Sequence, residues 1–279
     1  MLPLLLERTF PRFRLRGFSR STIATFFHLR ELGVLFDVGA CPNEAAAASD
    51  LLLSHLHLDH AQALPYYASL RTLHGMKPGR VHVPLGTGDG VRRWIDAFAA
   101  LQGADGGRFQ YTLCEHAPGE DIPLSGRLFA RTLRADHRVP SLGFTVFEAR
   151  DKLLPAFVGL PGAELAARRA RGEPLTQRTL TPLVTYLGDT GPRVFEDHPE
   201  VGESEVLIAE CTFLAPEHRE NARETGHLHI EDFAERASLF RNANVLLTHF
   251  SLRYADALLP DLVRAALPEA LCARVQLLL

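Results

Sequence analysis

The stretch that decides the fold reads Ser54-His55-Leu56-His57-Leu58-Asp59-His60, and it follows directly on the apolar run Leu51-Leu52-Leu53. A short run of leucines of this kind indicates a buried strand. Three imidazoles and a carboxylate are costly to bury unless a cation compensates them, and they are ligand types that zinc prefers. The stretch therefore predicts a metal site at the end of a strand.

The spacing within the stretch predicts two metal ions. His55 and His57 lie two residues apart, so in an extended segment their side chains point the same way and can hold one ion. Asp59 and His60 begin the next turn and can face a second ion. The alternative is a solvated histidine-rich loop without metal, but the alternation with leucine directly after a buried strand favours the two-metal layout.

Composition bounds the class of protein. The chain has 279 residues, of which 46% are hydrophobic and 23% charged, as in a globular protein with one large domain, although the length alone also allows two. The formal net charge is -3, so there is no overall positive field for nucleic acid. Any contact with RNA must come from a local basic patch.

The cysteines and the apolar runs indicate the compartment. The four cysteines are widely separated and form no C-x-x-C pair, so neither a disulfide framework nor a thiolate zinc site is expected. The apolar run from Leu2 to Leu6 is too short for a signal peptide, and no apolar stretch has the length of a membrane span. We expect a soluble protein of the cytoplasm that has no membrane partner.

Hydrophobic patterns along the chain predict an α/β protein. The first 40 residues alternate as in strands, with Gly, Arg and Ser at the breaks, which indicates antiparallel hairpins. Strand, helix and strand then alternate, as in a layered α/β fold. The later elements that we expect in this half are helical segments over 43–49, 61–70 and 91–101, a strand over 80–84 and a strand-rich segment over 109–147.

Residues 150–178 break the strand pattern and are rich in arginine. Arg168, Arg169 and Arg171 lie there, and this composition suits an arm that contacts the phosphates of a substrate. The alternative, which the sequence leaves open, is a solvated helix face on which Glu164 and Arg168 pair at i,i+4 spacing.

Polar side chains also follow several strands of the second half. The edge of a layered α/β sheet where the strands end is where ligands gather. Seven groups of zinc-compatible chemistry lie at such ends: His55, His57, Asp59, His60, His137, Asp189 and His249. Seven ligands suit two metal ions if one carboxylate bridges them and a hydroxide supplies the remaining position.

These motifs resemble those of the metallo-β-lactamase superfamily and, within it, the ribonuclease Z family, in particular its short, plant-type branch. The first stretch specifies only the superfamily, whereas the run Thr248–Tyr254, with its Arg253-Tyr254 ending, is much more specific to ribonuclease Z. The resemblance covers nearly the whole chain and implies a four-layer αββα sandwich over residues 1–279. It also implies a homodimer and endonucleolytic removal of the 3′ trailer from precursor tRNA. The other motifs that carry it are His137–Phe144, Leu187–Thr190, Gly226–His229 and Gly159–Gly162.

The resemblance also implies roles for single residues. One zinc ion would be held by His55, His57 and His137, the other by Asp59, His60 and His249, with Asp189 bridging them. His227 would be the proton donor and Glu210 the group that orients it, with His229 as a weaker candidate for donor. The family usually has His-Glu-Ala-Thr around this glutamate, and Ala209 and Cys211 depart from that pattern.

The chemistry of a two-metal site supports these roles. A hydroxide held between two zinc ions is nucleophilic at neutral pH, Asp59 could accept the proton of the water, and a histidine oriented by a carboxylate can protonate the leaving 3′ oxygen. The simpler reading of His227 is a polar residue at the start of a helix, without a catalytic part. The residues that we expect to contact substrate are Arg168, Arg169, Arg171, Arg253 and Tyr254.

Other readings of the chain stay open. A two-metal site does not choose its leaving group, so a hydrolase of small phosphodiesters or sulfate esters is the alternative enzyme. A metal-binding protein without catalytic activity is a third reading, disfavoured because no ligand is missing. The cofactor is expected to be two Zn²⁺ ions, with Mn²⁺ as the other candidate.

Overall fold

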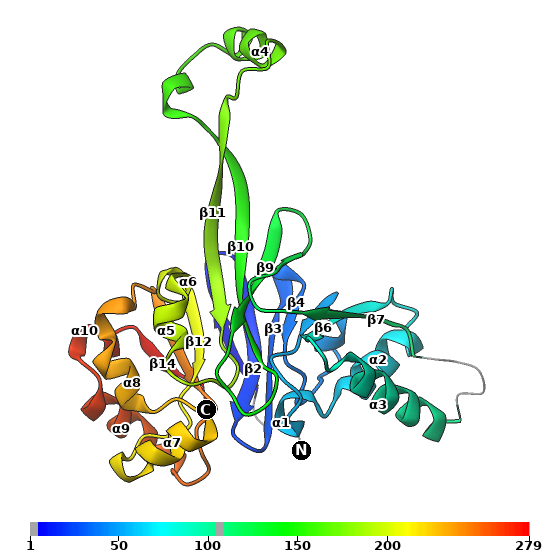
Figure 1. The fold of residues 1–279 in the computed structure, drawn as a ribbon, viewed down its shortest axis with the longest axis vertical. Coiled ribbons are helices and arrows are strands. Elements are labelled where there is room, and N and C mark those ends of the chain that lie inside the picture. The colour runs from blue at the N-terminus through cyan, green and yellow to red at the C-terminus, as the bar shows by residue number, and fades with distance from the viewer. Residues whose placement is uncertain (1–4, 104–108, 279) are drawn as a thin grey trace.

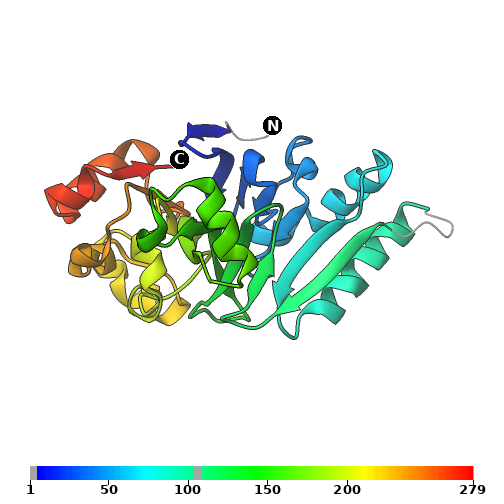
Figure 2. The ribbon, with the colours of Figure 1, turned by 90° about the horizontal axis from the view of Figure 1, so that it is seen from above.

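Two β-sheets packed face to face, with helices on their outer sides, make up the body of the molecule (Figure 1). The computed structural model describes residues 5–103 and 109–278. Seen from above, the strands lie in the middle, with helices of the two halves of the chain on either side (Figure 2). This arrangement confirms the predicted α/β fold with four layers.

The first sheet comes from the N-terminal half. Strands β1 to β4 pair antiparallel, which confirms the predicted hairpins, and β4 to β7 pair parallel. Helices α2 (Leu64–Leu73) and α3 (Gly88–Leu101) connect the parallel strands. The strands, in sheet order, are β1 (Leu6–Thr9), β2 (Arg14–Arg20), β3 (Ala24–Leu29), β4 (Val34–Phe36), β5 (Asp50–Leu52), β6 (Gly79–Pro84) and β7 (Tyr111–His116).

The second sheet comes from the C-terminal half. Strands β8 to β11 pair antiparallel, and β11 to β14 pair parallel. Its strands are β8 (Asp121–Pro123), β9 (Leu128–Arg134), β10 (Leu142–Leu153), β11 (Thr176–Tyr186), β12 (Val206–Glu210), β13 (Asn244–Thr248) and β14 (Val275–Leu277). The helices that follow β11 are α5 (Val194–Asp197), α6 (Pro199–Glu203), α7 (Arg219–Thr225), α8 (Ile230–Glu235), α9 (Leu259–Ala266) and α10 (Glu269–Cys272).

The core between the sheets combines aliphatic side chains with a group of stacked aromatic rings. The ring of Phe36 in β4 stacks on Phe144 in β10 with centroids 6.3 Å apart and on Tyr186 in β11 at 5.0 Å. All three side chains are fully buried, and offset aromatic pairs of this kind add about 0.5–1.5 kcal/mol beyond the area they bury. These contacts fix how the two sheets lie against each other.

The segment over 150–178, called the arm below, is a long hairpin that projects from the body (Figure 1). Strands β10 and β11 pair out to Leu153 and Thr176, and helix α4 (Gly162–Ala170) lies at the tip. The prediction that this segment breaks the strand pattern is therefore wrong at both ends. Outside the body the strands have no buried face, so they lack the alternation of polar and apolar residues by which strands are recognised.

Two smaller predictions are also wrong. The alanine-rich segment over 43–49 forms only the 3-10 turn Ala45–Ala47, because so few residues between two strands cannot sustain an α-helix. The residues from Ile230 to Phe240 also predict one helical run, but the helix ends at Glu235 and a 3-10 turn follows over Ala237–Leu239. Among the described helices, none is long and apolar enough to cross a membrane.

Candidate metal centre

The seven predicted ligands come together at one edge of the two sheets. The segment after β5, with its short helix α1 (Leu58–Ala61), carries the first four of them, and the loops after β9, β11 and β13 carry His137, Asp189 and His249. Their ligand atoms form two clusters, the first of His55, His57, His137 and Asp189, the second of Asp59, His60 and His249. The grouping is the one that the resemblance implied.

In the first cluster the histidine nitrogens converge on one point. Nε2 of His55 lies 3.0 Å from Nδ1 of His57, which lies 3.3 Å from Nε2 of His137. Oδ2 of Asp189 is 3.6 Å from Nε2 of His55. Ligands about 2.0–2.1 Å from a zinc ion in tetrahedral geometry are about 3.3 Å apart, so the spacing of these atoms fits one such ion.

The second cluster shares Asp189 with the first. Nε2 of His60 lies 3.2 Å from Nε2 of His249 and 3.4 Å from Oδ2 of Asp189. Oδ1 of Asp189 is 3.6 Å from Nε2 of His249, and Oδ2 of Asp59 is 3.4 Å from that nitrogen. Both oxygens of Asp189 therefore face the clusters, as a bridging carboxylate requires.

The second nitrogen of four rings is held by a hydrogen bond directed away from the clusters. Nδ1 of His55 donates to Oγ of Ser54 at 3.0 Å, and Nδ1 of His137 donates to the carbonyl of Gly226 at 2.9 Å. Likewise, Nδ1 of His60 donates to Oδ2 of Asp37, and Nδ1 of His249 donates to Oγ1 of Thr212. Each of these rings therefore carries its proton on the outer side and turns an unprotonated Nε2 inward, which is the tautomer that a metal ligand needs.

A buried oxygen without a hydrogen-bond partner provides a second test of whether the site fits a metal ion. Oδ1 of Asp189 makes no hydrogen bond with any described residue although it is buried. A buried, unpartnered carboxylate oxygen is costly. The carboxylates of Asp189 and Asp37 both lie against the ring of His60, at 3.4 and 2.7 Å, so negative charge is concentrated here. Negative potential at this point favours a cation, and the donor set fits divalent metal ions.

Asp37 is the residue of this site that the sequence did not reveal. It follows β4 with a positive φ of 52°, and its carboxylate accepts from the backbone N–H of Ser54 at 2.6 Å, the hydroxyl of Ser54 at 2.7 Å and Nδ1 of His60 at 2.7 Å. The hydroxyl of Tyr186 donates to it as well. Its place at a strand end, shared with the predicted ligands, is the signal that could have found it.

Beside the metal clusters lies the pair of Glu210 and His227. Oε1 of Glu210 accepts from Nδ1 of His227 at 3.0 Å, and it is held in place by the backbone N–H groups of Thr190 and Leu228, both at 3.1 Å. Burial alone would lower the pKa of His227, but the charge of Glu210 and this hydrogen bond raise it to about 9. At pH 7 this imidazole therefore carries a proton that it can donate.

His229 has a different place. Its Nδ1 accepts from the N–H of Glu231 at the start of α8, and its Nε2 contacts the carbonyl of Ala215 at 3.0 Å. It caps a helix and is fully buried, so it offers no exposed proton.

The expected substrate contacts are spread over the molecule. Arg169 and Arg171 are exposed on the arm, although the guanidinium of Arg171 also lies 3.7 Å from Glu173. The guanidinium of Arg168 pairs with Glu164 at 2.9 Å and with Glu173 at 3.1 Å. The i,i+4 pair of the alternative reading is thus present. Arg253 is exposed and stacks over a phenylalanine ring.

Tyr254 is buried rather than open to a substrate. Its hydroxyl accepts from the backbone N–H groups of Leu214 and Ala215 at 3.0 and 3.1 Å and contacts Nδ1 of His218 at 2.6 Å. These contacts tie the loop after β13 to the loop after β12, so Tyr254 positions both loops beside the clusters.

The fold and the site define a class of protein, the beta-lactamase superfamily, whose domain model matches residues 39–250. The chain is 32% identical over 264 residues to tRNase Z TRZ1 of Arabidopsis thaliana, covering 94% of this chain and 93% of that protein. It is 30% identical to the chloroplastic tRNase Z TRZ2 of the same plant, over 87% of this chain and 68% of that protein. The chain belongs to the tRNase Z family within this superfamily, as its motifs predicted.

Solved structures agree with the fold. Human tRNase Z, short form (ELAC1), superposes with a TM-score of 0.59 at 21% identity, covering 94% of this chain and 93% of that one. The Zn(2+)-bound PqqB of Methylobacterium extorquens superposes with a TM-score of 0.53 at 15% identity, covering 96% and 87%. At these identities the likeness concerns the fold alone.

Proposed function

We propose that the chain is an endoribonuclease that removes the 3′ trailer from precursor tRNA. The observation that carries the proposal is the pair of ligand clusters joined by Asp189, with His227 held 3.0 Å from Glu210 beside them. Relatives that match most of the chain are named tRNase Z. They favour this substrate over the small phosphodiesters and sulfate esters that the site alone would also allow.

The proposed cofactor is two Zn²⁺ ions, with Mn²⁺ as the other candidate. His55, His57 and His137 would hold one ion and Asp59, His60 and His249 the other, and Asp189 would bridge them. Divalent ions held there supply Lewis acidity toward the phosphoryl oxygens and make water acidic enough to attack at neutral pH.

Three residues of the chain are proposed to move or hold protons. Oδ2 of Asp59 accepts from the backbone N–H of Thr22 at 2.7 Å, which aims the carboxylate at the clusters, where it accepts the proton of the attacking water. His227 donates the proton on its ring to the leaving 3′ oxygen, and Glu210 holds that ring in place. A carboxylate that fixes a catalytic imidazole in this way is a recurrent arrangement.

The body of the tRNA is proposed to lie against the arm. Arg169 and Arg171 are exposed near its tip, and guanidinium groups there can contact phosphates of the RNA. Arg253 is proposed to contact the RNA beside the clusters. We propose that the protein acts as a homodimer in the cytoplasm. Each chain would form a single domain from which the arm projects.

The test exploits the difference between two leaving groups. A 5′-labelled precursor tRNA should be cut directly after the discriminator base in the presence of Zn²⁺ or Mn²⁺. His227→Ala should slow this cleavage by about 10²- to 10⁴-fold, the usual contribution of a general acid. The same variant should hydrolyse bis(p-nitrophenyl) phosphate nearly as fast as the wild type, because nitrophenolate leaves without a proton.

Two results would contradict the proposal. Activity on the small ester alone, with no cleavage of precursor tRNA, would assign the site to small substrates. Equal rates of tRNA cleavage by wild type and His227→Ala would remove His227 from the mechanism.

A second experiment tests the arm. The double variant Arg169→Glu, Arg171→Glu should weaken tRNA binding and reduce its salt dependence. Arg93→Glu, on the exposed side of α3, is the matched control.

A further inference from the structure

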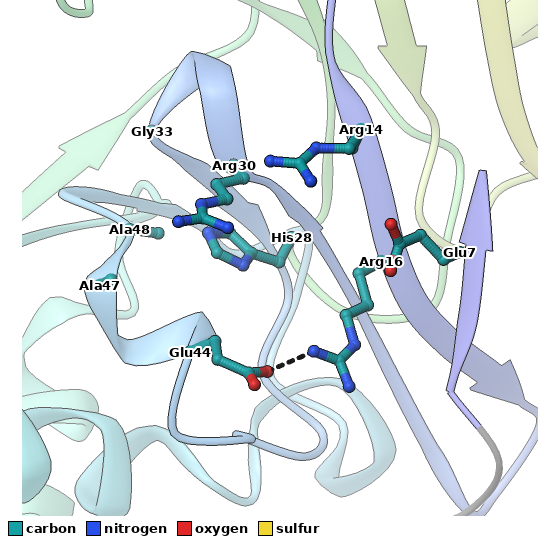
Figure 3. Close-up of a pocket in the computed structure, with 9 residues that line it drawn as sticks. All are labelled: Glu7, Arg14, Arg16, His28, Arg30, Gly33, Glu44, Ala47 and Ala48. Atoms are coloured by element: carbon teal, nitrogen blue, oxygen red, sulfur yellow. Dashed lines mark hydrogen bonds and ion pairs between the residues drawn. The ribbon is translucent and has the colours of Figure 1, made fainter. Parts of the chain in front are cut away.

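A pocket of about 490 Å³ lies on the outer face of the first sheet, apart from the metal centre (Figure 3). Strands β1, β2 and β3 line it together with Gly33 and with Ala47 and Ala48 of the turn before β5. Leu15 and Phe27 alternate with its lining residues along β2 and β3 and belong to the core between the sheets, so the pocket faces outward. None of its residues belongs to either ligand cluster.

Positive charge dominates the lining. Three guanidinium groups, of Arg14, Arg16 and Arg30, face the carboxylates of Glu7 and Glu44. Two of the three are engaged, because Arg16 pairs with Glu44 at 2.6 Å and Arg14 pairs at 2.8 Å with Glu31, which does not line the pocket. The side chain of Arg30 makes no ion pair or hydrogen bond within residues 5–103 and 109–278. Its five N–H donors are therefore available to an anion.

A buried histidine next to Arg30 also lacks a partner. His28 is only 6% exposed, and its ring makes no hydrogen bond with any residue that the structure describes. Figure 3 shows the imidazole projecting from β3 into the pocket, between Arg30 and Glu44. Burial and the charge of Arg30 lower the pKa of His28, so the ring is neutral at pH 7 and has one N–H to donate.

We propose that this pocket binds a phosphate monoester of the size of a mononucleotide. The phosphate would lie between Arg30 and His28, where a guanidinium fork and an imidazole N–H can donate to its oxygens. The neutral part of the ligand would lie against Ala47 and Ala48, whose small side chains leave the room. The volume of the pocket is in the range of sites that bind small molecules, and the excess of guanidinium over carboxylate in its lining matches an anionic group.

The test measures binding of 5′-AMP to the metal-loaded protein by calorimetry, with adenosine and inorganic phosphate as comparison ligands. Arg30→Gln removes the free guanidinium, and Ala47→Trp fills the pocket without a change of charge. Arg93→Gln removes an exposed arginine of α3 that does not line the pocket and serves as the matched control. Because phosphates also approach metal ions, the ring signals of His28 in NMR spectra, assigned with His28→Gln, report binding at the pocket itself.

The expected result is that 5′-AMP binds and shifts the His28 signals, while adenosine does not. Arg30→Gln should weaken this binding about tenfold or more, as the loss of a charged hydrogen bond does. Ala47→Trp should abolish it, and Arg93→Gln should leave it unchanged. Unshifted His28 signals, equal binding by Arg30→Gln and wild type, or inorganic phosphate binding as tightly as 5′-AMP would overturn the proposal. None of these readouts depends on cleavage of RNA.

Discussion

Replacing Asp37 by asparagine is expected to weaken metal binding while the protein stays folded. The carboxylate of Asp37 receives hydrogen bonds from Ser54, His60 and Tyr186. Asparagine has nearly the same volume and tolerates the positive φ of 52° at this position, so the backbone need not move. What it removes is the negative charge that holds the outer nitrogen of His60.

The magnitude follows from these contacts. A hydrogen bond to a charged group contributes roughly 1.5–3 kcal/mol and one between neutral groups roughly 0.5–1.5 kcal/mol, so the change to an amide costs about 1–1.5 kcal/mol of stability at the bond to His60. Loss of an outer partner of a metal ligand typically lowers metal affinity about 10- to 100-fold. On the binding scale this equals about 1.4–2.7 kcal/mol.

The assay is the metal content of wild type and Asp37→Asn after dialysis against a series of chelator concentrations, together with urea unfolding. Asp50→Asn is the control, because Asp50 is an equally buried carboxylate that pairs with Arg80 and His82 away from the clusters. It should lose stability but keep its metal. If Asp37→Asn retains metal as firmly as the wild type, the outer hydrogen bonds do not organise the site, and the reasoning fails.

Three further changes test the packing beside the metal clusters and the pocket that His28 lines. Gly39→Ala places a Cβ 1.9 Å from the carbonyl oxygen of Asp59, so unfolding in urea should show a loss of about 1–3 kcal/mol or more, and an unchanged midpoint would contradict the close packing. Tyr254→Phe leaves the backbone N–H groups of 214–215 without their acceptor and should cost about 2–4 kcal/mol in the same assay; a loss below about 0.5 kcal/mol would disagree. Burial and the charge of Arg30 lower the pKa of His28 in the folded protein below the unfolded-state value near 6.5. The contribution of the neutral ring to the free energy of unfolding is therefore complete above that pH and is lost as the pH falls toward the lower folded-state pKa. Stability curves of wild type and His28→Gln between pH 8 and 5 should therefore converge as the pH falls, and parallel curves would refute this assignment.

The sequence predicted the ligands because their chemistry and their position coincide. Each one stands where an apolar run ends, and parallel strands bring such ends to one edge. Asp37 occupies the same kind of position, but its contact with the site is to Ser54 and to the ligand His60, which both belong to another strand connection. That contact exists only once β4 pairs with β5, and a pairing between distant segments cannot be read from the residues of either one. From the sequence alone, Asp37-Val38-Gly39 after an apolar run predicts only a turn at the end of a strand.

The strands of the arm, unlike the metal ligands, could not be predicted from the sequence. Its arginines and its length were visible in the sequence, but its strands were not, because both faces of β10 and β11 beyond the body are exposed and no burial pattern records them. Pairing there depends on the register set inside the body, where the same two strands are buried. The strands of the arm continue a pairing that the core has already fixed.

The metal centre and the core depend on the same contact between the sheets. His55, His57, Asp59 and His60 follow a strand of the first sheet, whereas His137, Asp189 and His249 follow strands of the second, so each cluster takes ligands from both. The spacing of the ligand atoms is therefore set by how the sheets pack. Tyr186 makes this explicit: its ring stacks on Phe36 across the core, and its hydroxyl donates to Asp37. A shift between the sheets would separate the halves of both clusters at once, so metal ions bound there would in turn hold the sheets together and stabilise the folded chain.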